Sequence, residues 1–132
     1  MPQLTREQIV ERLQTDSVTI AAAPATRTAL TAAVPDRKMR FIVKMVLHGD
    51  GVTSRTVDIE KLKKDGTPTV DADFTMKFND VPVAPADVRN IPEGSYDLEN
   101  PILVLEGGTR PYGRVSAGAG LNVTTIYWDN DV

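Results

Sequence analysis

The 132-residue sequence predicts an all-β fold, an antiparallel β-sandwich or barrel of about seven or eight short strands after one short helix. Two observations support this fold class. After Asp16, hydrophobic residues recur with a period of two, which is typical of half-buried strands. Turn residues such as Pro35-Asp36, Gly49-Asp50-Gly51 and Gly107-Gly108 separate these segments. A chain of this length is expected to form one domain.

The N-terminal residues carry the one clear helical pattern. Thr5-Arg6-Glu7-Gln8 fits a capping box, in which the Thr5 hydroxyl accepts from the Gln8 N–H and the Gln8 side chain reaches back. About ten residues is marginal for an isolated helix, so this helix must dock on a surface. That surface belongs either to its own domain or to a neighbouring subunit, for which the helix is then an arm. The apolar staple and stripe are Leu4, Ile9, Val10 and Leu13.

We divide the chain into an N-terminal helix or arm, residues 1–16, and a β-sandwich domain, residues 17–132. In the first half of that domain, Val18 and Ile20 alternate with polar residues, and Thr28 to Val34 is expected to be extended. The strongest strand pattern spans Arg40 to His48. Its predicted inner face is Phe41, Val43, Met45 and Leu47, and its predicted outer face is Arg40, Lys44 and His48. Arg55 to Leu62 alternates again, with Val57 and Ile59 inward and Thr56, Asp58 and Glu60 outward.

The second half continues the alternating pattern. Phe74, Met76 and Phe78 alternate with polar residues, whereas prolines and acids from Asn79 to Asn100 predict a loop with at most short edge strands. Ile102 to Leu105 is apolar on both faces, which favours a central strand. The last two predicted strands are Tyr112 to Ala117 and Leu121 to Asp129.

The final strand contains the only tryptophan and one of three tyrosines. Tyr127 and Trp128 are consecutive, so they must point to opposite faces of the sheet. A large ring left in water forfeits its hydrophobic stabilisation, and Trp128 is therefore expected to be largely buried, in the domain or against a neighbour.

The charges are distributed unevenly along the chain. Residues 1–64 carry 11 basic and 7 acidic side chains, a net charge of +4, and residues 65–132 carry 4 and 11, a net charge of −7. Either the two halves pair within one domain, or a basic patch of one copy meets an acidic patch of the next. The overall charge of −3 and the absence of an apolar run near 18 residues favour neither nucleic acid nor a membrane as a partner.

The sequence indicates no catalytic, cofactor-binding or metal-binding residue. It has no cysteine, and its single histidine, His48, is expected at an exposed strand end rather than in a dyad with Asp50. Metal sites on β-barrels of the cupin type use several histidines, because neutral imidazole is their main ligand. Asp71 with Asp73, and Asp129 with Asp131, could face a hard cation, but neither pair continues into a known ligand spacing, and we expect solvated loop and tail charges.

One arrangement of segments resembles a known class of proteins. The segments are AAVPDRKMRFIVKMVLHGDG, RTVDIEKL, VPVAPADVRNIPEGSYDLENP and ILVLEGGTRPYGRVSAGAGLNVTTIYWD. Their order, over about residues 18–129, resembles small β-sandwich, jelly-roll-like virion proteins of tailed phages and other icosahedral viruses, the decoration, cement and minor capsid proteins. Gly108-Thr109 in place of Gly-Asp and the N-terminal helix depart from that pattern.

The resemblance implies a non-enzymatic structural protein that is made in the host cytoplasm and resides in the virion. Its partners are then copies of itself, a major capsid protein, or both. The alternatives are a β-sandwich module that binds a carbohydrate or a receptor, and an enzyme on a small barrel. The residues predicted for the interface between subunits are Leu4, Ile9, Val10, Leu13, Tyr127 and Trp128.

Overall fold

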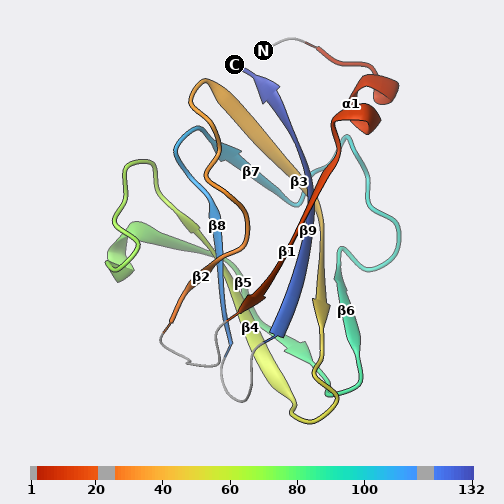
Figure 1. The fold of residues 1–132 in the computed structure, drawn as a ribbon, viewed down its shortest axis with the longest axis vertical. Helices are drawn as coiled ribbons and strands as arrows, with labels where there is room; N and C mark the ends of the chain where they lie inside the picture. Colours follow the sequence, from red (N-terminus) through yellow and green to blue (C-terminus); the bar gives the residue numbers. More distant parts are fainter. Residues whose placement is uncertain (1–2, 21–25, 116–120) are drawn as a thin grey trace.

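The computed structural model describes residues 3–20, 26–115 and 121–132. In that part of the chain, nine strands form two antiparallel sheets, and one α-helix precedes them (Figure 1). The predicted fold class is therefore confirmed. The elements are α1 (Arg6–Arg12), β1 (Gln14–Ile20), β2 (Thr28–Ala29), β3 (Lys38–His48), β4 (Arg55–Leu62), the 3-10 turn η1 (Asp71–Asp73), β5 (Phe74–Val83), β6 (Val88–Ile91), β7 (Leu103–Glu106), β8 (Pro111–Val115) and β9 (Leu121–Asp131).

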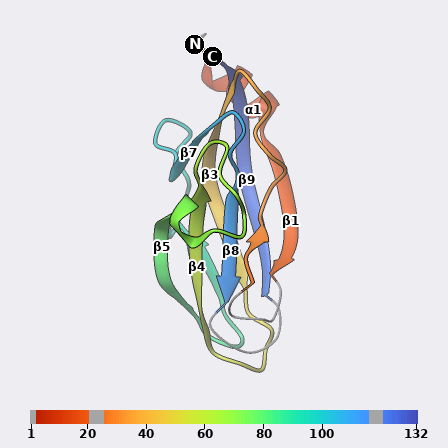
Figure 2. The same cartoon turned by 90° about the vertical axis from the view of Figure 1, so that its left-hand side faces the viewer.

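The strand order shows how the two sheets are wound. Sheet A has the order β1-β9-β3-β6, with β7 also paired to β3, and sheet B has the order β2-β8-β4-β5. Sheet A lies at the right of Figure 1 and sheet B at the left, and Figure 2 looks onto the outside of sheet B. Along the chain, β4 pairs with β5, β3 with β6 and β7, β2 with β8, and β1 with β9. This is one long antiparallel ribbon rolled into a sandwich, the jelly-roll arrangement.

The main hydrophobic core lies between the two sheets. It forms because alternate residues of each strand face inward, as the period of two predicted. Val57 and Ile59 of β4 are fully buried there, as expected. The other large buried side chains of this core include Ile20, Leu30, Ile42, Met45, Leu47, Leu105, Leu121 and Tyr127.

The faces predicted for β3 are wrong in its first half. A register shift between Ile42 and Lys44 leaves Val43 without a directly paired residue on β9. Such a bulge inserts one residue and exchanges the two faces of the strand. Phe41 and Val43 therefore face the outside of sheet A, whereas Arg40 points inward with Ile42 and is buried.

Three further expectations also differ from the structure. β7, expected as a central strand, pairs with β3 alone among the described strands and alternates buried with exposed residues, so it is an edge strand. In β5 the register shifts between the partners of Ile59 and Glu60. Phe78 consequently packs on the main core, whereas Phe74 packs edge-on against Tyr112. The strand expected over Thr28 to Val34 is only two residues long.

Candidate functional site

His48 ends strand β3 and is partly exposed. The carboxylate of Asp50 does not orient it but accepts hydrogen bonds from the backbone N–H groups of Thr53 and Val52, 2.9 and 2.8 Å away, and from Arg55. These bonds, the one from Thr53 foremost, lower the pKa of Asp50. Asp50 therefore holds the turn before β4, and no dyad with His48 forms.

The acid pairs considered as cation ligands are neutralised by basic side chains instead. Within the described part of the chain, no three His, Cys, Asp or Glu side chains gather where they could hold a metal ion. Four ion pairs each join a basic residue of the positively charged half, residues 1–64, to an acidic residue of the negatively charged half, residues 65–132. The opposite charges of the two halves therefore pair inside the domain. The pairs are Arg27–Asp71 at 2.6 Å, Lys38–Asp131 at 2.7 Å, Arg40–Asp129 at 2.8 Å and Lys63–Asp73 at 2.9 Å.

The outer face of sheet B carries a compact group that we call the Glu60 cluster: Arg27, Glu60, Phe74, Tyr112 and Arg114. Glu60 is only 3% exposed. It accepts two hydrogen bonds of 3.1 Å from Arg27, and Arg114 Nε lies 3.0 Å from its carboxylate. The Arg27 guanidinium also lies 4.0 Å above the Phe74 ring. Burial lowers the pKa of Arg27, but its bonds to Glu60 and Asp71 outweigh that effect and raise it. Arg27 and Arg114 also pair with Asp71 and Asp58, so the cluster and these two acids together form an ionic cover for the sheet.

α1 packs on the outer side of sheet A at the end of the sandwich near the chain termini (Figure 1). The predicted capping box is present: Thr5 Oγ1 accepts from the Gln8 N–H at 3.2 Å, and Gln8 Oε1 accepts from the Thr5 N–H at 2.9 Å. The helix rests on what we call the helix-side cluster, in which Trp128 is 6% exposed. The prediction that Trp128 is largely buried is confirmed. The cluster consists of Val43, Leu98 and Trp128, with Leu4, Ile9, Leu13, Phe41 and Ile126 packed against them.

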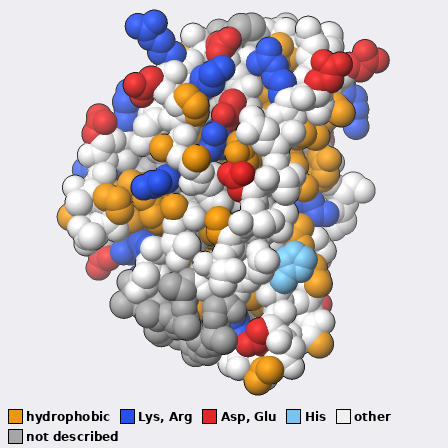
Figure 3. Space-filling model, in the orientation of Figure 1, with side chains coloured by type: hydrophobic (Ala, Val, Ile, Leu, Met, Phe, Trp, Pro, Cys, Tyr) orange, Lys and Arg blue, Asp and Glu red, His pale blue; other side chains and the backbone are white. Residues whose placement is uncertain are grey.

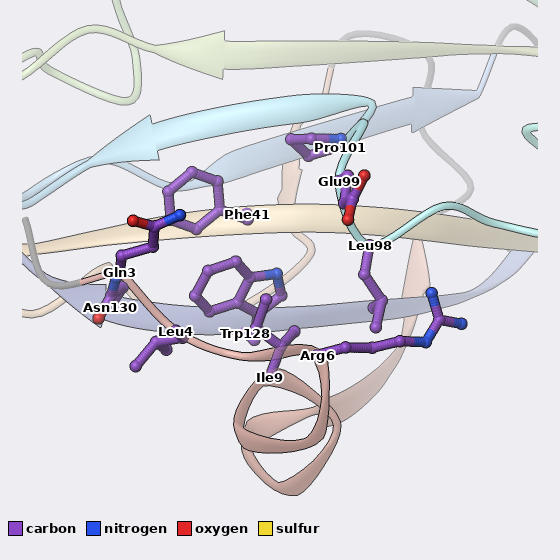
Figure 4. A pocket seen from close by; sticks show the side chains of 10 residues that line it. All are labelled: Gln3, Leu4, Arg6, Ile9, Phe41, Leu98, Glu99, Pro101, Trp128 and Asn130. Atoms are coloured by element: carbon purple, nitrogen blue, oxygen red, sulfur yellow. The ribbon is translucent and has the colours of Figure 1, made fainter.

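A hollow of about 390 Å³, which we call the Trp128 hollow, opens beside this cluster (Figure 4). Its walls come from α1 and the residues just before it, from β3, from β9 and from the segment between β6 and β7. The lining residues are Gln3, Leu4, Arg6, Ile9, Phe41, Leu98, Glu99, Pro101, Trp128 and Asn130.

The indole ring of Trp128 forms part of the wall of this hollow. Phe41 stacks on one face of the ring, with centroids 4.4 Å apart and planes 19° apart. Leu4 and Ile9 lie on the other side (Figure 4). The indole Nε1 is buried and has no hydrogen-bond partner within the described part of the chain. In Figure 4 its nitrogen lies on the side of Leu98 and Glu99.

Tyr127 faces the other way and belongs to the main core, 3% exposed. Its hydroxyl donates to Asp16 at 2.9 Å, and the Arg40 guanidinium lies 4.2 Å from its ring centre. Arg40 is held by two hydrogen bonds to Asp129, of 2.8 and 2.9 Å. Burial, and then the bond to Asp16, raise the pKa of Tyr127 to about 12 although Arg40 opposes the shift. Tyr127, Asp16, Arg40 and Asp129 together close one end of the sandwich.

The predicted interface residues do not all lie on the surface. Val10 is 51% exposed, Leu4, Ile9 and Leu13 are half-buried, and Tyr127 and Trp128 are buried inside the domain. Val10 and Leu13 line a second depression together with Tyr96, which is 36% exposed. In Figure 3, acidic and basic side chains lie at the upper right, where Figure 1 places α1, and hydrophobic side chains lie just below them along the right edge.

Sequence reasoning missed two contributors to this region. Leu98 and Tyr96 lie in the acid- and proline-rich segment after β6, where no periodicity marks them. An apolar residue amid acids at Leu98 is the single signal that could have indicated a packing role. The alternating pattern predicts Phe41 in the main core, whereas the bulge in β3 brings it to Trp128.

No family model matches the sequence, and no curated protein matches it. No helix in the described residues is both long and apolar enough to span a membrane. Among solved structures, the chain is similar to a chain in the crystal structure of the T13 IBDV viral particle, with a TM-score of 0.47 and 11% sequence identity. The match covers 92% of this chain and 35% of that chain, so this protein spans about a third of the neighbour's length.

Proposed function

We propose that this protein is a non-enzymatic structural component of an icosahedral virion, a capsid, cement or decoration protein that acts by self-association and packing on a symmetric shell. The observation that carries the proposal is the rolled-ribbon strand order of the two sheets. Jelly rolls of this kind occur in viral capsid domains, in lectins and in cupins. Its partners are copies of itself, a major capsid protein, or both, and neither nucleic acid nor a membrane.

The other two classes that share this winding fit the chain less well. Cupin metal sites use several histidines, and this sequence has one. A lectin site commonly presents a flat aromatic face to a sugar. Here Phe41 and Trp128 stack on each other, and Arg27 covers Phe74. Tyr96 is the aromatic side chain with the most exposure in the described residues.

The surface around α1 supports a role in assembly. No residue of α1 is fully buried, although the helix is apolar on one side. Val10 and Tyr96 line the same depression, and Arg6 and Lys44 line it as well. An apolar centre with a charged rim is the usual anatomy of a protein–protein interface. In this proposal Val10, Leu13 and Tyr96 contact the neighbour, while Leu4, Ile9 and Trp128 support the helix from beneath.

The test is the mass in solution as a function of concentration, measured by sedimentation for the full chain and for Val10→Glu. A charge at the centre of the interface should weaken self-association at least tenfold, because burying it unpaired costs more than about 1.4 kcal/mol. Val52→Glu is the matched control, since Val52 is 82% exposed in the turn before β4. Val52→Glu should leave self-association unchanged.

Two results would contradict the proposal. One is a chain that stays monomeric up to about 1 mM, where even weak specific interfaces are populated, which would contradict self-association and leave a major capsid protein as the partner. The other is equal association of wild type, Val10→Glu and Val52→Glu. Retention on a glycan array would favour the lectin-like alternative.

A further inference from the structure

The depression that Val10 and Tyr96 line beside α1 is basic. Arg6 and Lys44 line it as well, and no acidic residue of the described chain does. Lys44 pairs with Ile126 of β9 on the outer side of sheet A, is half-buried, and makes no ion pair with a described residue. A half-buried cation has lost part of its hydration, so an anion that approaches it is attracted more strongly than at an open surface.

Arg6 is the second cation of this depression, and it lies exposed at the start of α1. Asp97 is close by, but its carboxylate accepts from the Asn100 side chain at 2.7 Å and from the Glu99 N–H at 2.9 Å. These two bonds, and to a smaller extent the charge of Arg6, lower the pKa of Asp97. No ion pair joins Asp97 to Arg6, so Arg6 and Lys44 both remain available to a further anion.

The acidic residues of α1 lie on the opposite flank of Val10. Successive residues of a helix are rotated by about 100°, which places Arg6 on one flank of Val10 and both Glu7 and Glu11 on the other. Glu7 and Glu11 are exposed, and neither makes an ion pair within the described part of the chain. The surface around Val10 is therefore apolar at its centre, basic on one side and acidic on the other, and Figure 3 shows both kinds of charge where α1 lies.

Such a surface is complementary to itself. In a twofold interface the same patch meets its own copy, so each contact occurs twice. A twofold axis parallel to α1 sets the acidic flank of one copy against the basic flank of the other, whereas an in-plane axis perpendicular to α1 sets like charges together. Glu7 and Arg6 differ by only about 1.5 Å along the helix, so a parallel axis also brings them level.

We propose that this depression binds α1 of a second copy of the chain about a twofold axis parallel to the helix. Val10 lies at the axis, Glu7 of each copy pairs with Arg6 of the other, and Glu11 pairs with Lys44. The inference rests on the self-association proposed above and names the surface that meets Val10. The charges fix the orientation of the two copies, and the apolar centre supplies most of the affinity.

The test is charge reversal in the full chain, with the dimer dissociation constant measured by sedimentation. Lys44→Glu and Glu11→Lys should each weaken dimerisation about tenfold, because two attractive pairs per dimer become repulsive. The double variant Lys44→Glu with Glu11→Lys should recover to within about threefold of wild type, since the attraction returns with its signs exchanged. High salt, about 1 M, should reduce these differences.

The matched control is Lys77→Glu combined with Glu11→Lys, which has the same net charge as the restoring double variant. Lys77 is exposed on β5, in the other sheet, so this combination should associate as weakly as Glu11→Lys alone. Thermal melting shows whether each variant folds. If Lys44→Glu does not fold, Arg6→Glu and Glu7→Lys, both at exposed positions, take the place of the first pair with the same expectations.

Three results would overturn the inference. The first is a restoring double variant that associates as weakly as the single variants. The second is equal recovery in the control, which would show that net charge alone acts. The third is a smallest assembly other than a dimer, a persistent monomer included. If Val10→Glu still weakens association in the first two cases, the proposed function stands and only this arrangement of the two copies is wrong.

Discussion

The two outer faces of the sandwich are covered in different ways. Sheet A is covered by α1, which contributes partly buried apolar side chains and leaves a hollow beside Trp128. Sheet B is covered by the Glu60 cluster, in which charges and rings satisfy one another. When part of an apolar cover is removed, the free energy of unfolding falls in proportion to the apolar area that becomes exposed to water. A buried ionic cover is weakened when one member is removed, because the remaining charges lose a buried partner.

Trp128→Ala, on the side of sheet A, should cause the largest loss of the free energy of unfolding. It removes the ring that joins Phe41 to the helix, and a buried tryptophan replaced by alanine costs about 4 kcal/mol of the free energy of unfolding. Urea denaturation measures it, with Val52→Ala as an exposed control. A loss below about 1 kcal/mol would show that the helix-side cluster does not stabilise the domain.

Glu60→Ala should break the cover of sheet B at a cost of about 3 kcal/mol, since Arg27 and Arg114 lose their shared carboxylate. Asp71 is the matched control: it also binds Arg27, but its side chain is 87% exposed. Asp71→Ala should cost no more than about 0.5 kcal/mol. If Glu60→Ala and Asp71→Ala lowered the free energy of unfolding equally, the burial of a carboxylate would not determine its contribution to stability.

Deleting residues 1–13 should cost about 2 kcal/mol and leave a cooperative thermal transition, because Leu4, Ile9 and Leu13 are only half-buried. The cut must fall before Gln14, which already pairs with Tyr127 in β1. Circular dichroism measures the melting temperature, and sedimentation measures self-association, which should weaken if α1 is also an arm. Loss of the cooperative transition would make the helix an integral part of the fold.

Tyr127→Phe should have the smallest effect at neutral pH, about 1 kcal/mol, from the lost hydrogen bond to Asp16. Its effect depends on pH. The ordinary pKa of a tyrosine is 10.0, and folding raises the pKa of Tyr127 to about 12, so between these values the unfolded chain loses the proton more readily than the folded one. Wild-type stability should therefore fall between pH 10 and pH 12, and the fall should be shallower in Tyr127→Phe. Parallel pH profiles of the two proteins would refute the assignment.

The sequence was sufficient for the features that depend on local pattern. The Thr5 capping box, the inward pair Val57 and Ile59 and the burial of Trp128 follow from spacing and side-chain type alone. The rest depends on contacts between distant segments. No local sequence pattern predicts the bulge at Val43. This bulge moves Phe41 to the outer face of the sheet and Arg40 to the inner face.

The candidate site shows the same division. The apolar residues of α1 were predicted from their helical spacing, but Leu98 and Pro101 come from a segment without periodicity. The unpaired Trp128 Nε1 is a property of the assembled surroundings and has no signature in the sequence. The Glu60 cluster was equally hidden, because an acid on the outward face of a strand is ordinarily solvated.

The rolled ribbon also implies an order of folding. Its central hairpin, β4 with β5, joins residues close in the chain, whereas Gln14 and Tyr127 at its open end are 113 residues apart. Closing the short loop first reduces the entropic cost of each later pairing. The strand pairs should therefore form in order from β4–β5 toward β1–β9. On the ribosome, β1 then remains unpaired until its partner strand β9 has been made. Mutations at Val57 should accordingly slow refolding, whereas mutations at Val123 should mainly speed unfolding; the reverse pattern in stopped-flow kinetics would contradict this order.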